Sequence, residues 1–339
     1  MRATVLTDQA LVKQAGRFVW LSIDTEDAKN APYLEKFPWE AVPTFQVINP
    51  AAETVAFQWV GACDANELVK RFDEGEKAFH EASAKPAAPT GADSELNALA
   101  MADKNQECAE KALALAPTLP PGAMKANVVS TGLDCALGAK PEESPWRPAA
   151  LTTLEAATKE ALTYPGLLDD DRSALYGELV DARDRQDDKD GGKAAAGAWL
   201  DWLDQQAKSA PSSEARAALD GYRVSAAIRA AAPERVLASI QASERELPND
   251  YNPPARLALV YREMGKYDDA LAASDRALAK VYGPRKMTIL DARATIYEKK
   301  GDAAKAKATL QEALDYAKTL PAPQQPKGMI KRIEKKLNG

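Results

Sequence analysis

The sequence predicts an α/β segment followed by a long all-α array. Three short apolar runs, at residues 18–24, 44–48 and 54–60, are rich in β-branched and aromatic residues and are typical of strands. Beyond residue 94 the chain is rich in alanine and poor in aromatic residues, which favours closely packed helices. Its last part repeats with a period of about 36 residues, which indicates a repeat architecture.

The composition limits the classes of partner. The chain has 339 residues, enough for two or more domains, and a formal net charge of −6, so nothing points to nucleic acid or an anionic membrane surface. No run approaches the roughly 18 apolar residues of a membrane span. No signal peptide is visible before Asp8. We therefore expect no nucleic acid partner and no membrane span.

The first half of residues 1–79 is predicted to contain short helices around one strand. Residues 4–15 indicate the end of one helix and a second, short helix that starts at Asp8. Phe18–Asp24 is apolar almost throughout, which predicts a strand buried on both faces. Residues 28–36 predict a helix with Pro32 near its start, a position where proline is tolerated.

The second half of this segment is predicted to form a hairpin and a helix. Pro43 has no N–H to donate, so it can begin a strand over residues 44–48 but cannot lie inside a central one. The short connection to residues 54–60 predicts a hairpin. Asp64 then starts a helix, with Glu67 as its capping-box partner.

This order of helix, strand, helix, strand, strand and helix resembles the latter part of the thioredoxin fold. The run from Lys36 to Thr44, Lys-Phe-Pro-Trp-Glu-Ala-Val-Pro-Thr, looks like the family's approach to its cis-proline. Asp24 matches the aspartate that commonly ends the preceding strand, and Val60-Gly61-Ala62 looks like the Gly-Ala pair after the last strand. The fold class is thus a partial thioredoxin-like sheet domain followed by a helical solenoid.

The resemblance implies a substrate-binding site at Val42 and Pro43. It implies a cis bond between these residues, with Val42 offering backbone hydrogen bonds to an extended peptide. The alternative is an ordinary trans proline at a strand start. Trp39 lies either beside this site, partly exposed, or in the core.

The family's Cys-x-x-Cys pair is missing from the chain, which has only Cys63, Cys108 and Cys135. One explanation is that Met1 lies just downstream of such a pair. We prefer it because the sheet would otherwise lack an interior strand and expose unpaired edges. The other explanation is a domain that has lost its redox chemistry.

The three cysteines have separate interpretations. Cys63 follows the Gly61-Ala62 pair, so it is either a modulatory thiol or a cysteine without a role. Cys108 and Cys135 are 27 residues apart, on what would be two helices of one hairpin. We expect two inert buried thiols there, although a disulfide would form in an oxidising compartment.

A linker and a set of irregular hairpins follow. Residues 80–93 are rich in alanine and proline, without apolar periodicity, which predicts a linker. Residues 94–250 predict degenerate helical hairpins, with a break near Asp103 and turns at 117–121, 141–148 and 187–192.

The segment 251–339 resembles tetratricopeptide repeats closed by a C-terminal capping helix. Two stretches align on small, aromatic and glycine positions, which are Ala258/Ala294, Tyr261/Tyr297, Gly265/Gly301, Ala270/Ala306 and Ala277/Ala313. The small residues let paired helices approach closely, and each glycine accepts the geometry of the turn between them. The resemblance implies a concave face that binds protein or peptide clients.

The remaining polar clusters have structural interpretations. Residues Asp169–Asp171 precede a helix, where carboxylates favour the positive end of the helix dipole, and residues 187–190 are expected to form a solvated turn. Neither has the ligand spacing of a calcium loop. His80 is the only histidine and is expected to be solvated. We therefore predict no metal site, no cofactor and no catalytic residue in this chain.

Taken with these resemblances, the chain is expected to act in thiol–disulfide exchange or redox-linked handling of protein clients, with the repeats for protein–protein interaction. The exchange would need a thiolate that the chain lacks, so we expect the chain itself to be redox-inactive. The alternative is a non-enzymatic scaffold that binds peptides. A signal upstream would place the protein in the periplasm, and otherwise the cytoplasm is expected.

Overall fold

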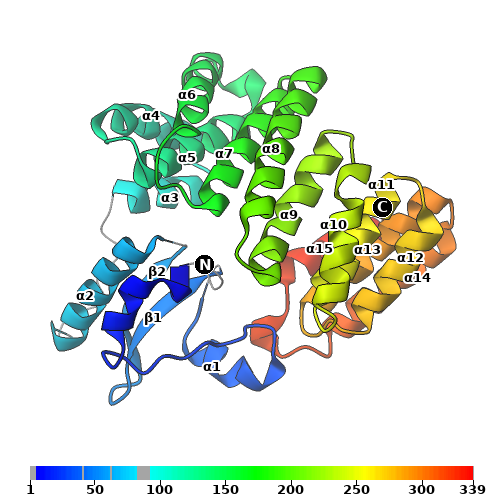
Figure 1. Cartoon of the computed structure of the whole chain (residues 1–339), viewed down its shortest axis with the longest axis horizontal. Coiled ribbons are helices and arrows are strands. Elements are labelled where there is room, and N and C mark those ends of the chain that lie inside the picture. The colour runs from blue at the N-terminus through cyan, green and yellow to red at the C-terminus, as the bar shows by residue number, and fades with distance from the viewer. Residues whose placement is uncertain (1–4, 40–41, 62, 82–91, 339) are drawn as a thin grey trace.

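The computed structural model describes residues 5–39, 42–61, 63–81 and 92–338. A small N-terminal α/β module lies beside an arch of helices, and segments from both ends of the chain meet below the arch (Figure 1). None of the described helices is both long and apolar enough to cross a membrane. Residues 82–91, the middle of the predicted linker, lie outside the described part of the chain.

The start of the module is less regular than predicted. Two 3₁₀ segments, η1 (Val5–Thr7) and η2 (Gln9–Gln14), take the place of the α-helices expected over residues 4–15. Asp8 separates them and accepts a hydrogen bond from the Ala10 N–H at 2.8 Å, so it caps η2 as predicted. A side chain that bonds its own backbone in this way favours a turn over a continued helix.

The predicted strand at Phe18–Asp24 is wrong. The described sheet contains two strands, and neither pairs with this segment. Val19 is 91% exposed and Leu21 72% exposed, while Phe18 and Trp20 pack against Phe72 with ring centroids 5.8 and 5.0 Å away. Strand propensity reflects packing on a pleated, half-buried surface, so an apolar run without a neighbouring strand does not form one.

The rest of the module follows the prediction. Strands β1 (Thr44–Asn49) and β2 (Thr54–Val60) form an antiparallel hairpin, with a register irregularity between Val47 and Ile48. Segment η3 (Ala28–Asn30) leads into helix α1 (Ala31–Lys36). Helix α2 (Ala65–Glu81) covers the hairpin with buried Leu68 and Phe72.

The cap of α2 is only half of the predicted capping box. The Glu67 N–H donates to the Asp64 carboxylate at 2.8 Å, as expected. The Glu67 carboxylate instead accepts from Arg71 at 3.2 Å, one turn further along α2. A nearby guanidinium competes for the carboxylate that would otherwise return to the backbone.

The arch is built from consecutive helices that pack against their neighbours in the chain, as predicted for a helical solenoid. Asp103, with φ of 54°, breaks the first long helical stretch where a break was expected. The glycines of the predicted turn at 187–192 lie inside a helix, because Asp188 caps that helix through the Gly191 N–H. The bounds are α3 (Ala92–Met101), α4 (Asn105–Leu115), η4 (Ala116–Thr118), α5 (Ala123–Gly138), η5 (Pro141–Glu143), α6 (Arg147–Ala161), α7 (Asp169–Arg185), α8 (Lys189–Ser209), α9 (Ser213–Arg229), α10 (Glu234–Glu246), α11 (Asn252–Glu263), α12 (Tyr267–Leu278), α13 (Arg285–Lys300), α14 (Ala303–Ala317), η6 (Ala322–Gln324) and α15 (Lys327–Asn338).

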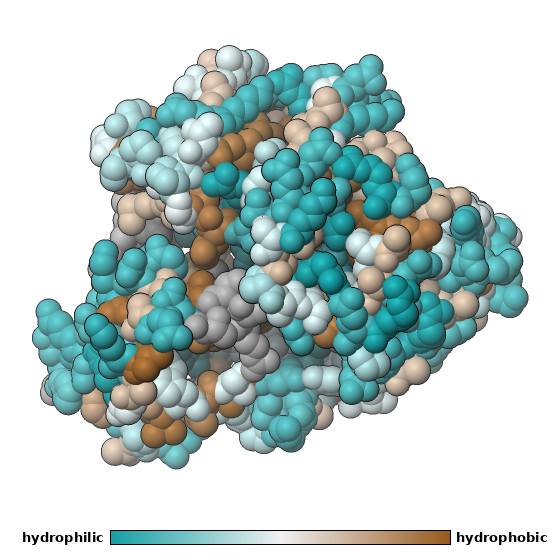
Figure 2. All heavy atoms as spheres, viewed as in Figure 1, coloured by the Kyte–Doolittle hydropathy of each residue, from teal (hydrophilic) through white to brown (hydrophobic). Residues whose placement is uncertain are grey.

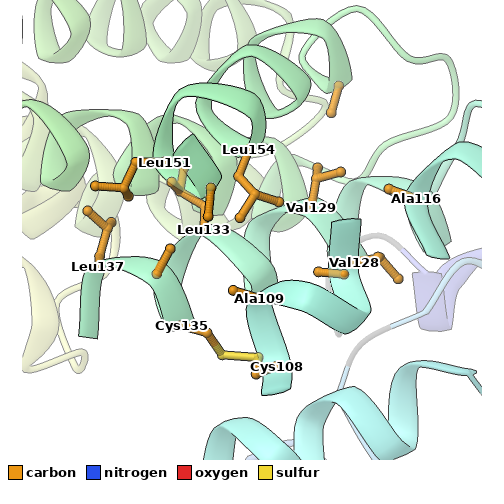
Figure 3. Close-up of a cluster of buried hydrophobic side chains, with 14 of the residues drawn as sticks. Cys108, Ala109, Ala116, Val128, Val129, Leu133, Cys135, Leu137, Leu151 and Leu154 are labelled. Atoms are coloured by element: carbon orange, nitrogen blue, oxygen red, sulfur yellow. A yellow bond between two sulfur atoms is a disulfide. The ribbon is translucent and has the colours of Figure 1, made fainter. Parts of the chain in front are cut away.

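The expectation of two free thiols at Cys108 and Cys135 is wrong. Their sulfurs are bonded, and the bridge joins α4 to α5 in the apolar core of the first hairpins (Figure 3). The Cα atoms are 6.1 Å apart, within the range that disulfides span. Sequence spacing could not decide between the two states, because both need the same close packing of the two helices.

The last four repeat helices show the packing that their residue pattern predicts. The small residues of the repeat pattern are all at most 3% exposed. They are Ala258, Ala270, Ala277, Ala294, Ala306 and Ala313. Gly265 and Gly301 have positive φ values of 72° and 87° in the turns after α11 and α13. Glycine takes this left-handed geometry without a Cβ clash, so it ends each helix sharply.

Candidate functional site

The predicted substrate-binding residues lie at the entry to β1. The peptide bond between Val42 and Pro43 is cis, as the resemblance implied. The Val42 side chain is 67% exposed, and the Pro43 carbonyl accepts a hydrogen bond from the Gly61 N–H at 2.9 Å. That bond ties the start of β1 to the end of β2 and presents Val42 to solvent. Glu40 and Ala41, which precede this site, lie outside the described residues.

The hairpin supports this entry from one side. Phe45 of β1 stacks on Trp59 of β2 with ring centroids 4.6 Å apart, and Trp59 is 7% exposed in the module core. Gln46 donates from its side-chain nitrogen to the Pro38 carbonyl at 3.0 Å and to the Gln58 side-chain oxygen at 2.8 Å. These contacts fix β1 between the approach loop and β2.

One edge of β1 pairs with β2, and no second strand of the described chain pairs with its other edge. An edge of this kind presents backbone N–H and C=O groups that an extended peptide can pair with. Hydrophobic residues are visible at the surface of this module, at the lower left of Figure 2. Val19 and Leu21 of the same module are exposed, so the module also presents apolar side chains to solvent.

Trp39 and Cys63 occupy different surroundings. Trp39 is half-buried, between the two positions, partly exposed or in the core, that the sequence left open. Cys63 is buried at 7% exposure in the module core, and burial raises the pKa of its thiol to about 11. Since the thiolate is the reactive form, this thiol is held in its unreactive state near neutral pH.

The cysteines therefore offer no nucleophile at this site. Cys108 and Cys135 are bonded to each other and are 0% and 2% exposed. The sequence contains no further cysteine. What the site presents is strand β1, which pairs with β2 in the described sheet, and the exposed side chain of Val42.

The acidic clusters act as helix caps in the structure. Asp171 accepts from the Leu168 N–H at 3.3 Å at the start of α7, and Asp188 caps α8 through the Gly191 N–H at 2.9 Å. Within the described residues, no three His, Cys, Asp or Glu side chains are arranged to hold a metal ion.

A second candidate surface belongs to α11–α14. The helices of this segment pair in sequence order, α11 with α12 and α13 with α14, and stack on one another through α12 and α13. Residues 251–319 match the tetratricopeptide repeat family. These TPR helices support a role in protein–protein interaction. A comparison with curated proteins found no match to the chain.

Two features of the structure had no signal in the sequence. One is the exposure of Val19 and Leu21, since the composition of their segment predicted burial. The other is a set of contacts between residues 24–27 and the last TPR helix pair, which are about 258 residues away in sequence. Only an alignment with covarying positions could have signalled a contact over such a separation.

Proposed function

We propose that this chain binds protein or peptide clients and does not itself carry out thiol–disulfide exchange. The observation that carries the proposal is the combination of a TPR segment with an N-terminal module in which β1 pairs with β2 alone among the described strands and starts beside exposed Val42. Main-chain pairing along such an edge supplies affinity, and alternate side chains supply specificity.

The thioredoxin-like interpretation belongs to this proposal as its finer form. It is supported by the cis bond before β1, the hairpin and the helix that covers it. In this form the module holds an extended client strand in the manner of a substrate-binding thioredoxin domain. The TPR segment holds a second part of the same client.

The bonded cysteines support an oxidising compartment, in which disulfides persist. We accordingly propose that the protein works outside the cytoplasm, for a bacterial protein in the periplasm. A fractionation assay that follows the protein with an antibody tests this, and recovery only with cytoplasmic markers would contradict it.

The site proposal is tested with a fluorescently labelled, reduced and alkylated polypeptide as the client, in a fluorescence-anisotropy titration. Val42→Asp places a charge at the entry to β1 and should weaken binding roughly tenfold, about 1.4 kcal/mol. The matched control is Val12→Asp, since Val12 is similarly exposed at 63% and lies on η2. Equal affinities for the two variants would show that the β1 edge does not bind the client.

A further inference from the structure

An acidic turn of the N-terminal module contacts the last TPR helix pair. The turn consists of Asp24–Asp27, and its shape is set by its own hydrogen bonds. The Asp24 carboxylate accepts from the Glu26 N–H at 2.9 Å, and the Asp24 carbonyl accepts from the Asn30 side chain at 2.8 Å. The turn therefore presents carboxylates and carbonyl oxygens outward in a fixed arrangement.

The surface that faces this turn supplies matching donors. The Tyr282 hydroxyl donates to the Asp24 carboxylate at 2.6 Å, and Arg285 Nε donates to the Glu26 carboxylate at 2.6 Å. The Gln324 side-chain nitrogen donates to the carbonyls of both Thr25 and Asp27, at 3.0 and 2.9 Å. We call Tyr282, Gly283, Arg285 and Gln324 the receptor surface.

Gly283 shows how closely the two parts meet. Its φ is +60°, and a Cβ built on it would lie 2.3 Å from the Glu26 carbonyl oxygen. Any other residue would push the turn away, so glycine is required here for contact as well as for backbone geometry. Gly265 and Gly301 also have positive φ, but a Cβ on either would meet open space.

These contacts join the two ends of the chain. Helix α1, which follows the turn, packs against η6, which carries Gln324 (Figure 1). On its other side the module core contacts Leu168, just before α7. The module is therefore held at two places on the helical arch, one just before α7 and one at its last repeat.

The contact at the last repeat is polar and partly open to water. The Arg285 side chain is 58% exposed and Tyr282 is 51% exposed, whereas Glu26 is 20% exposed in its side chain and Gln324 is buried. Exposed ion pairs contribute little to stability, whereas the core of the repeats is buried and apolar. Contacts of this kind can open locally while the repeats stay folded.

We propose that the receptor surface binds the acidic turn as a reversible latch, which holds the N-terminal module closed against the last repeat. The latch consists of contacts inside the chain, so its test does not depend on whether the chain binds a client. When it opens, the module stays attached through its contact at Leu168 and through the chain itself, and the receptor surface becomes accessible.

The test is hydrogen–deuterium exchange on the full chain with Gly283→Ala. Loss of the latch should raise exchange of the peptide spanning residues 24–36 about fivefold or more, although the substitution lies in a distant segment. Gly265→Ala is the control, because it carries the same left-handed strain without touching the module. Unchanged exchange at residues 24–36 in Gly283→Ala, or an equal rise in both variants, would overturn the proposal.

A charge exchange keeps the test decisive if Gly283→Ala unfolds the last repeat. Glu26→Arg and Arg285→Glu should each raise exchange at residues 24–36, because each places like charges opposite one another. The double variant restores opposite charges and should return exchange toward the wild-type level. A double variant that exchanges as fast as the faster single variant would refute the latch.

Discussion

Glu178 is a side chain of α7 whose environment opposes its charge. Its Oε2 atom is buried without a hydrogen-bond partner among the described residues. Burial raises the pKa of Glu178 to about 7, and the nearby carboxylates of Asp134 and Asp181 add to the rise. A buried carboxylate without compensating partners destabilises the folded state when it ionises.

Because of this buried charge, we expect Glu178→Gln to increase the free energy of unfolding in a pH-dependent way. The folded-state pKa lies above the unfolded value of 4.5, so the folded state binds the proton more tightly and loses stability as pH rises from about 4.5 to about 7. The amide cannot ionise, so the variant should be more stable at pH 8 by on the order of 1–3 kcal/mol and nearly unchanged at pH 4. Urea unfolding at both values measures this.

The control for that measurement is Glu312→Gln. Glu312 is an exposed residue of α14, so its substitution should not change stability at either pH. If Glu178→Gln increases the free energy of unfolding as much at pH 4 as at pH 8, burial of the charge is not the cause of the stabilisation.

For single residues, the sequence predicted backbone conformation better than it predicted the bonding and protonation of side chains. The cis bond at Pro43 and the positive φ of Gly265 and Gly301 followed from their motifs. The bonding of Cys108 to Cys135 did not, because a thiol pair and a disulfide occupy the same helix contact. The pKa of Cys63 could not be read either, since it depends on packing by Phe72 and neighbours far along the chain.

Among the elements, the hairpin of α4 and α5 depends on its cross-link. The disulfide closes a loop of 27 residues in sequence separation, which in the chain-entropy model stabilises the fold by about 3–4 kcal/mol. The double variant Cys108→Ala with Cys135→Ala should therefore unfold at lower urea. A reducing agent should lower the midpoint of the wild type and leave that of the double variant unchanged.

Thiol counting checks the cross-link itself. The denatured, unreduced protein should take up one alkyl group by mass spectrometry, at Cys63, and three after reduction. Uptake of three alkyl groups without reduction would contradict the disulfide between Cys108 and Cys135.

Close helix packing in the repeats gives a separate prediction. Ala306 of α14 is 3% exposed, whereas Ala308 on the same helix is exposed. Ala306→Leu should overpack the interface with the neighbouring helices and lower stability by about 1–3 kcal/mol. Ala308→Leu has equal helix propensity and should be neutral. Thermal unfolding that shifts equally in both variants would contradict the packing argument.

At the element scale, regular periodicity made the helices and the hairpin predictable. Helices such as α10, α12 and α15 bury apolar faces of period 3.6, and β1 with β2 has a short connection that specifies its own partner. The strand prediction for Phe18–Asp24 was wrong because a strand needs a neighbouring strand. The composition of the segment carries no information about whether such a neighbour exists.

Across the whole molecule, the module and the TPR segment are brought together by contacts that sequence patterns do not encode. The acidic turn meets Arg285 and Gln324 from opposite ends of the chain. The proposed role follows from this arrangement, in which a small module with a two-stranded sheet is held next to a helical arch whose residues 251–319 match the tetratricopeptide repeat family.

The proposed function requires that the full chain binds extended clients without thiol chemistry. The most direct measurement compares insulin with fully reduced and alkylated insulin chains in the same binding and turbidity assay. We expect saturable binding of the alkylated chains and no cysteine-dependent reduction of intact insulin. Turnover of insulin disulfides that is lost when the chain's cysteines are substituted, or a failure to bind the alkylated chains, would contradict it.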